Sequence, residues 1–415
     1  YVTCLDAKVS NLEITNAEKS RKEYLLMDEL VLPNQVNFQY SGTVTLRDSL
    51  GTPIWWIHPN SKPLQKYNLA FLRDPKLIDN GRKVLMATST SPALGASLDG
   101  FYISYDLTTH QVEKTYTGDS KINGKGTLDF HDLQILPNGE AVAIRYKKRN
   151  DVDLSSIGIA KGSEILDSEI VILNPDGTEK RHFSLIDKLK PEEISTNQPA
   201  YFNSNVQPVD VIHTNSIEIQ GNAAIISSRH LDAIHKINLN DGSIIWRLGG
   251  NSKTDKDLIV KNLYGALNQG NNTIRLNNLL SGQHDARILE NGNLSIFDNG
   301  TTAQRNPRVL TFKIDEKNRT AVINHVVTGS SQSTSYCCGS ARKLQDGAWL
   351  INWGGKFDQS RATLANGVSS TVLPSGVATR ILVRPMNVFS YRVIPYYLNN
   401  EQLNRFREDL ATREK

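Results

Sequence analysis

The sequence predicts an all-β fold of the β-propeller class, with six blades and a short C-terminal helix. Three observations predict it: one hairpin motif recurs along the chain, a second hairpin signal follows most of its copies, and strand–turn–strand signals lie toward both ends. Repeats of four short strands are typical of propeller blades, whose radial arrangement leaves no long exposed sheet edge.

The recurring motif places an apolar residue before a turn glycine and β-rich residues after it. Its five copies are KLIDNGRKVLMA (76–87), QILPNGEAVAIR (134–145), SIEIQGNAAIIS (216–227), RILENGNLSIFD (287–298) and RKLQDGAWLINW (342–353). Asn-Gly or Asp-Gly at four of the five turns supplies the positive φ angles that two-residue hairpins require. Each copy is therefore predicted to be a hairpin.

The second hairpin signal completes a blade of four strands. It occurs at YDLTTHQVEKTY (105–116), ILNPDGTEKRHF (172–183), INLNDGSIIWRL (237–248) and FKIDEKNRTAVI (312–323). We expect the N-terminal stretch 42–57 to supply outer strands that close the ring against C-terminal strands near 379–397. This arrangement favours six blades, and five is the alternative count.

These signals divide the chain into three predicted parts. Residues 1–35 are an N-terminal segment, residues 36–397 are the propeller, and residues 398–415 are a C-terminal helix. Residues 401–415 combine helical spacing with balanced charge, which is typical of a solvated terminal helix.

Composition and charge exclude several classes of partner. The net charge of +4 over 415 residues is spread without a block of like charge, so neither a nucleic-acid nor a membrane-surface partner is predicted. No apolar run approaches the roughly 20 residues that a spanning helix needs. The first residue is Tyr1 rather than methionine, which favours a secreted, periplasmic or extracellular protein.

The cysteines do not form a disulfide framework, because the chain has only three. Cys337 and Cys338 are adjacent, so they could form only a strained vicinal bridge. Two buried thiols are the alternative interpretation. The sequence does not predict an oligomeric state.

Three histidines occupy one position of the repeat, eight residues before its turn glycine. They are His131, His213 and His284, while Arg73 and Gly339 occupy that position in the other two repeats. The first strand of each blade lines the central channel of a propeller, so we expect the three imidazoles to converge at one channel mouth.

A structural scaffold gives no reason for imidazoles at this shared position. Clustered imidazoles carry an electrostatic cost unless an anion or a metal compensates for it, which favours a functional interpretation. Five of the six histidines outside this position are interpreted as hydrogen-bonded structural residues. They are His58, His110, His182, His235 and His325.

Two kinds of chemistry suit such a cluster. Three neutral imidazoles could bind a zinc ion whose open position activates water for hydrolysis. Alternatively, imidazoles and a guanidinium could bind an anionic group, with one imidazole as nucleophile and another as acid or base. Arg229 is the candidate guanidinium because it lies eight residues after Gly221, which brings it back to the same end of the sheet. Bracing a loop is its alternative role.

A series of motifs in one order resembles the nucleotide-independent aryl sulfotransferases, from about residue 67 to about residue 355. The motifs are DFHDLQILPNG (129–139), DVIHTNSIEI (210–219), AIISSRHLDAIHKI (224–237), GSIIWRLGG (242–250), QHDARILENGNLSIFDNG (283–300) and CCGSARKLQDGAWLINWGG (337–355). The resemblance implies a six-bladed propeller that moves a sulfuryl group from a phenolic sulfate ester to another phenol. In that family the group passes through a sulfohistidine, and no nucleotide sulfate donor is used.

The resemblance also implies a role for each predicted site residue. His284 of QHDAR would be the nucleophile, and Arg229 of SSRH would bind the sulfate group. His131 of FHDL and His213 of IHTNS would share the acid–base work and the anion binding. The implied partners are a small phenolic sulfate and a phenol, with no cofactor and no metal.

Two other functions stay open at this point. One is a histidine-ligated metal hydrolase on the same propeller, and the other is a non-catalytic secreted binding or surface-assembly module. Asn215 and Ser216 follow His213 closely and either orient it or cap a loop.

Overall fold

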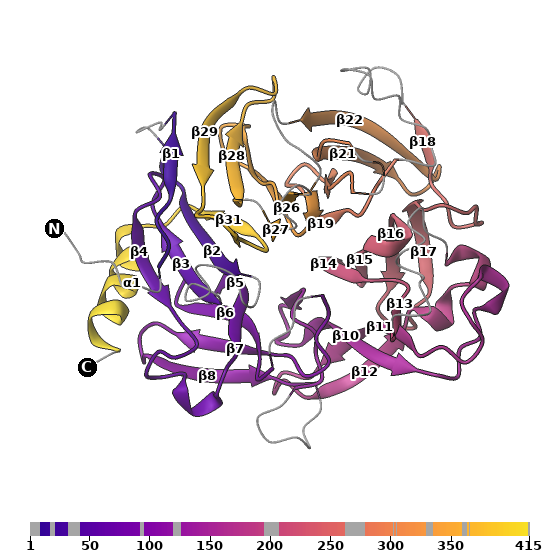
Figure 1. Ribbon diagram of the computed structural model, residues 1–415, viewed down its shortest axis with the longest axis horizontal. Helices are drawn as coiled ribbons and strands as arrows, with labels where there is room; N and C mark the ends of the chain where they lie inside the picture. The colour runs from indigo at the N-terminus through magenta and orange to yellow at the C-terminus, as the bar shows by residue number, and fades with distance from the viewer. Residues whose placement is uncertain are drawn as a thin grey trace. The chain divides into compact units, whose positions relative to one another are not determined.

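The computed structural model describes most of the chain. The described residues are 9–16, 21–31, 42–91, 95–118, 126–194, 207–261, 279–301, 303, 305–328, 335–358, 363–364 and 366–413. They form β-strands with a single α-helix among them (Figure 1). No helix in these residues has both the length and the apolar character that crossing a membrane requires.

The chain divides into two compact units. Unit 1 contains Tyr1–Phe130, Asp176–Thr178 and Ser335–Lys415, and unit 2 contains His131–Pro175 and Glu179–Thr334. The division into segments 1–35, 36–397 and 398–415 stays a prediction.

Unit 2 holds three antiparallel sheets of four strands, each wound in chain order. The first contains β9 (Leu133–Ile135), β10 (Ala141–Arg149), β11 (Ile165–Leu173) and β12 (Glu179–Ser184). The second contains β14 (Thr214–Gln220), β15 (Ala223–Ser228), β16 (Ala233–Asn238) and β17 (Ile244–Gly249). The third contains β19 (His284–Ile288), β20 (Leu294–Asp298), β21 (Arg308–Asp315) and β22 (Thr320–Thr328). The short strands β13 (Val209–Asp210) and β18 (Ile259–Lys261) pair in parallel with β11 and β22.

Unit 1 also holds three antiparallel sheets of four strands, one of which joins a late strand of the chain to an early one. Two of them contain β5 (Phe71–Ile78), β6 (Lys83–Ser89), β7 (Phe101–Asp106) and β8 (Gln111–Tyr116), and β24 (Ser340–Lys343), β25 (Trp349–Asn352), β28 (Val368–Val372) and β29 (Ala378–Val383). The third contains β31 (Val393–Tyr396), β2 (Tyr24–Val31), β3 (Thr43–Arg47) and β4 (Pro53–Ile57). Smaller additions are β1 (Glu13–Thr15) beside β29, β30 (Val388–Phe389) beside β2, and a sheet of β23 (Ser335–Cys337), β26 (Gly355–Asp358) and β27 (Thr363–Leu364).

Six four-stranded sheets among the described residues confirm the predicted all-β, six-bladed propeller class. All the predicted hairpins are present as antiparallel pairs, from β5–β6 through β24–β25. The stretch 42–57 forms β3 and β4, outer strands of the sheet that also contains β31. Residues 13–15 and 24–31 of the expected N-terminal segment are strands as well.

The turn glycines explain why the hairpins form where the sequence predicts them. Gly139 and Gly292 have φ angles of 84° and 78°, which a residue with a Cβ atom rarely adopts. The core of unit 2 then forms between neighbouring sheets. Its buried members include Ile225, Ile234 and Leu248 from one sheet and Leu294, Ile296 and Phe312 from the next.

The C-terminal helix α1 (Asn400–Thr412) is present as predicted, and it lies beside β4 (Figure 1). The expectation that it is merely solvated is wrong for one face. Phe406 is buried with its ring centroid 5.3 Å from that of Trp55. Asp409 is also buried, and it accepts hydrogen bonds from Trp55 Nε1 at 2.6 Å and from the Tyr105 hydroxyl at 2.7 Å. The balanced charge that predicted a solvated helix belongs only to its outer face.

Candidate active site

The four predicted site residues lie together in unit 2, each at the end of a strand. His131 precedes β9, His213 precedes β14, His284 begins β19 and Arg229 follows β15. Their exposed fractions are 4%, 8%, 2% and 5% in that order. The rings of His131 and His213 have centroids 5.1 Å apart.

Hairpin geometry brings Arg229 back to His213. Strands β14 and β15 are antiparallel, so the residue after β15 returns to the start of β14. The backbone N–H of Arg229 donates to the His213 carbonyl at 2.9 Å. The Arg229 side chain also lies beside Gly282, two residues before His284, and its charge lowers the pKa of the His284 imidazole.

The surroundings of His284 determine which of its ring nitrogens carries the proton. Nδ1 lies 2.8 Å from Asn299 Oδ1 and 3.1 Å from the Gly282 carbonyl oxygen, and both oxygens accept hydrogen bonds. Nδ1 is therefore the protonated nitrogen, and Nε2 keeps its lone pair. Burial, followed by the charge of Arg229, lowers the pKa of His284 well below its ordinary value. The imidazole is therefore neutral near pH 7.

The surroundings of His213 favour a role as the proton donor. Its Nδ1 lies 2.5 Å from Asp210 Oδ2, which is a short, charge-assisted hydrogen bond. Burial lowers the pKa of His213 below its ordinary value, and the Asp210 carboxylate offsets part of that shift. The two neighbouring imidazoles and Arg229 hold the pKa of Asp210 below its ordinary value despite its burial. Asp210 therefore stays ionised and supports a positive charge on His213.

A fourth imidazole, His230, belongs to the cluster although the repeat alignment does not include it. Its ring stacks on that of His213, with centroids 4.6 Å apart and an interplanar angle of 29°. Its Nε2 lies 2.8 Å from Arg229 Nη1, and its Nδ1 lies 2.7 Å from the Asp210 carbonyl oxygen. Burial lowers its pKa well below the ordinary value.

A buried guanidinium braces the strands that carry the site. Arg287 of β19 donates from Nη2 to Asp132 Oδ2 at 2.7 Å and from Nε to Asp285 Oδ1 at 3.0 Å. It also donates from Nη1 to the Ile217 carbonyl oxygen of β14 at 2.5 Å. Asp132 follows His131 and Asp285 follows His284 in the chain, so this network fixes the strand ends that hold both imidazoles.

Asn215 and Ser216 connect two sheets of unit 2. Asn215 Nδ2 donates to the Gln283 carbonyl at 2.8 Å, and the Ala286 N–H donates to Ser216 Oγ at 3.2 Å. Both contacts reach the β19 region. His213 itself donates from Nδ1 to Asp210 Oδ2, and this hydrogen bond orients its ring.

The remaining repeat positions and histidines have structural surroundings. Arg73 belongs to unit 1, where its guanidinium lies 4.4 Å from the ring centroids of both Phe71 and Phe130. His110 Nδ1 lies 2.9 Å from Asp409 Oδ1 on helix α1. His235 Nδ1 lies 3.0 Å from Ser228 Oγ, and burial lowers its pKa to about 3.

The group with metal-ligand spacing differs from the three aligned histidines. Among the described residues, Asp210, His213 and His230 offer ligand atoms that all lie within 4.8 Å of one another. In this structure those atoms already hydrogen-bond to one another or to Arg229. A guanidinium beside the group repels a cation and attracts an anion.

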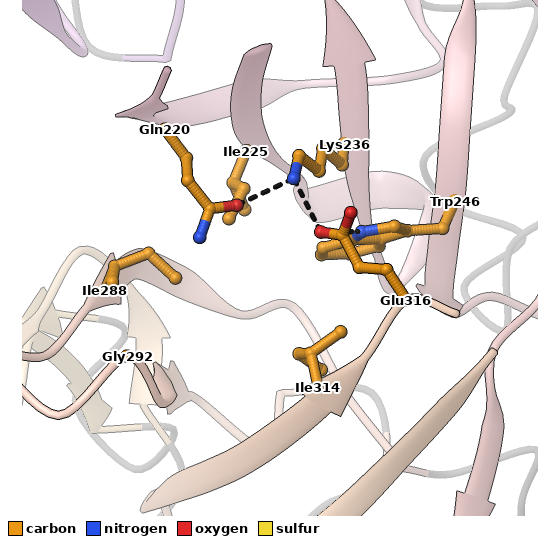
Figure 2. Close-up of a pocket in the computed structure, with 8 residues that line it drawn as sticks. All are labelled: Gln220, Ile225, Lys236, Trp246, Ile288, Gly292, Ile314 and Glu316. Carbon is orange, nitrogen blue, oxygen red and sulfur yellow. Dashed lines mark hydrogen bonds and ion pairs between the residues drawn. The ribbon is translucent and has the colours of Figure 1, made fainter. Parts of the chain in front are cut away.

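A separate pocket of about 380 Å³ lies at the opposite ends of two of the same strands (Figure 2). Gln220 ends β14 and Ile288 ends β19, so the pocket is remote along these strands from His213 and His284. Lys236 Nζ donates to Gln220 Oε1 at 2.7 Å and to Glu316 Oε1 at 2.5 Å (Figure 2). The charged groups that line this pocket, Lys236 and Glu316, are therefore paired with each other. None of the predicted site residues lines the pocket.

The described residues combine a β-propeller fold with clustered imidazoles that have a guanidinium beside them. The chain belongs to the arylsulfotransferase (ASST) family, whose model matches residues 15–384. This family is enzymatic, so the predicted class of aryl sulfotransferase is confirmed. A search of curated proteins found no match.

Solved structures offer only distant likenesses. A candidate 6-phosphogluconolactonase from Bacteroides fragilis is 11% identical, with a TM-score of 0.43 and coverage of 91% of this chain and 99% of that chain. The periplasmic gluconolactonase of Pseudomonas aeruginosa is 9% identical, with a TM-score of 0.43 and coverage of 90% and 98%. These values carry no inference about activity.

Proposed function

We propose that the chain transfers a sulfuryl group from a phenolic sulfate ester to a phenolic acceptor through a sulfohistidine on His284. One observation carries the proposal: the His284 Nδ1 faces two acceptors and therefore holds the proton, so Nε2 is the unprotonated nitrogen that can act as a nucleophile. Arg229 beside it suits the charge of a sulfate ester.

The first half-reaction forms the covalent intermediate. His284 Nε2 attacks sulfur, an N–S bond forms, and the bond from sulfur to the aryl oxygen breaks. The departing phenolate takes a proton from an imidazolium, for which His213 is the better candidate because Asp210 supports its charge. Arg229 and His131 stabilise the sulfuryl oxygens during this step.

The second half-reaction reverses these bond changes with a new phenol. The acceptor gives its proton to His213 and its oxygen attacks sulfur, so the N–S bond breaks and Nε2 regains its lone pair. Both half-reactions use one site in turn, which predicts ping-pong kinetics. No cofactor takes part in this scheme.

Replacement of His284 by alanine tests the nucleophile directly. We expect loss of transfer from a chromogenic aryl sulfate, while His182→Ala, which alters an exposed imidazole of unit 2, should leave it unchanged. Acid-labile sulfuryl mass on a His284 peptide during turnover would support the intermediate. Transfer by His284→Ala at the rate of the unaltered chain would contradict it.

Chelation separates this proposal from a metal hydrolase that uses Asp210, His213 and His230. We expect activity to survive chelators and the purified protein to lack stoichiometric zinc. Loss of activity on chelation, with recovery on adding zinc, would favour the hydrolase. If no phenolic sulfate in a broad panel is turned over, a non-catalytic binding module becomes the better interpretation. Export from the cytoplasm stays a prediction, which cell fractionation would test.

A further inference from the structure

We propose that His230 is a positioning residue that orients the Arg229 guanidinium without adding a negative charge beside it. This inference rests on the proposed sulfuryl transfer, because it assigns the residue that prepares the anion-binding group. It concerns a side chain that the repeat alignment and the family resemblance leave without a role.

The hydrogen bonds of His230 determine its tautomer. Nδ1 lies 2.7 Å from the Asp210 carbonyl oxygen, which can only accept, so Nδ1 holds the proton. Nε2 must then accept, and Arg229 Nη1 donates to it at 2.8 Å. A neutral imidazole therefore acts as the acceptor for a buried guanidinium.

Other buried arginines of unit 2 have a different partner. Arg287 donates to Asp132 at 2.7 Å, and Arg308 donates to Asp298 Oδ2 at 2.9 Å. A carboxylate partner of this kind orients a guanidinium but also cancels its charge. An imidazole partner such as His230 orients Arg229 without bringing a negative charge of its own.

The position of the His230 ring is fixed from two sides. Its backbone N–H donates to the Ile212 carbonyl at 3.1 Å, and its ring stacks on that of His213 at a centroid distance of 4.6 Å. Only 6% of the residue is exposed. A fixed acceptor restricts the rotamers of the guanidinium that donates to it, which lowers the entropy cost of binding an anion.

The test compares three replacements at position 230. His230→Gln supplies a neutral oxygen acceptor, and His230→Ala supplies none. His230→Glu supplies a charged acceptor that has the same shape as glutamine. The measurements are KM and kcat for a chromogenic aryl sulfate, and the calorimetric affinity for inorganic sulfate. His182→Ala is the matched control, because it removes an exposed imidazole from the same unit.

We expect His230→Ala to weaken sulfate binding by about 10- to 100-fold, the effect of losing one charge-assisted hydrogen bond. KM should rise more than kcat falls, because the residue acts through Arg229. His230→Gln should recover most of this loss, whereas His230→Glu should bind sulfate at least as weakly as His230→Ala. The Gln–Glu pair keeps the test valid if the alanine variant fails to fold.

Two results would overturn the inference: sulfate affinity unchanged in His230→Ala, or full affinity in His230→Glu. Failure of the proposed function has a different signature. If the unaltered chain binds sulfate but transfers no sulfuryl group, the mechanism on His284 is wrong. The sulfate series would still decide the role of His230.

An independent observation in unit 1 carries a second inference. We infer that Cys337 and Cys338 are an oxidisable vicinal dithiol that closes to a disulfide by exchange with a small-molecule disulfide. Consecutive residues of a regular strand point to opposite faces. Here Cys338 has a φ of 63°, and the two sulfur atoms lie 2.9 Å apart. This is well inside the roughly 3.5–4.0 Å at which heavy atoms ordinarily make non-bonded contact.

The order of the exchange follows from exposure. Cys337 is partly exposed and Cys338 is buried, so the Cys337 thiolate attacks the incoming disulfide and releases one thiol. Cys338 then attacks the Cys337 sulfur and releases the second thiol. Both electrons pass from the cysteine pair to the small-molecule disulfide, which is reduced to two thiols.

The experiment uses the full chain with Cys4→Ser, which leaves only the adjacent pair. After treatment with oxidised glutathione, we expect both thiols to disappear and the monomer to become lighter by two hydrogens. With Cys338→Ser added, Cys337 should instead retain a glutathione adduct. A persistent adduct on the intact pair, or two thiols that survive treatment, would refute the inference.

Discussion

Asp210→Asn isolates the charge that supports His213. The carboxylate lies 2.5 Å from His213 Nδ1, and the substitution keeps its shape while removing its charge. Hydrogen bonds to charged groups contribute about 1.5–3 kcal/mol, and each 1.36 kcal/mol is tenfold in rate, so we expect kcat to fall by about 10- to 100-fold. KM should change less, because Asp210 acts through the acid–base imidazole.

The substitution should also shift the pH dependence of the reaction. Asp210 raises the pKa of His213 against the effect of burial, so its removal lowers that pKa further. A smaller fraction of His213 is then protonated at any given pH. The limb of the pH–rate profile that depends on the acid should move to lower pH. Arg229 and His131 also lower this pKa, and both are unchanged in the variant.

The assay is steady-state transfer from a chromogenic aryl sulfate to a phenol across a range of pH. Asp241→Asn is a matched control, because Asp241 is an exposed residue of the turn between β16 and β17 in the same unit. Thermal unfolding of each variant checks that the fold is intact. A value of kcat within twofold of the unaltered chain, with the same pH profile, would refute the role of the Asp210–His213 pair.

Four further predictions concern other residues. Arg229→Ala should lower kcat/KM by about 100-fold or more in the same assay, as expected for loss of one oxyanion donor. Arg287→Leu should lower the free energy of unfolding in urea by about 3–5 kcal/mol, because it leaves buried carboxylates without their partner. Asp409→Ala should cost about 3 kcal/mol or more in the same measurement, because it leaves several buried donors unsatisfied. Double replacement of Cys337 and Cys338 by serine should leave turnover intact, since neither occupies the aligned position.

The hairpins and the histidine alignment were predictable because both rest on local chemistry. A turn glycine with positive φ marks the same point in every repeat, so counting back from it finds equivalent residues. His131, His213 and His284 lie on strand ends at that register. The constant spacing between histidine and turn glycine can be read from one sequence alone, so the three histidines could be aligned without a structure.

The supporting residues lie outside that register. Asp210 belongs to a two-residue strand that pairs with the preceding sheet, and His230 lies in a short 3-10 turn after β15. Asn299 follows β20 beside a turn glycine, where a polar residue is expected for any turn. Asp210 precedes His213 by three residues, and that spacing was the signal that could have identified it. Packing of helix α1 was missed because charge balance does not show which face is buried.

The composition of the two units has a consequence for biosynthesis. Unit 2 is almost continuous in the chain, from residue 131 to residue 334, whereas one sheet of unit 1 joins β2–β4 to β31. Pairing of Leu26 with Ile394 must wait until the later strand has emerged from the ribosome. The unit that holds the imidazoles can therefore fold first, while strands synthesised earlier wait for their partner. Chaperones that protect exposed strand edges should accordingly engage residues 24–57 of the nascent chain.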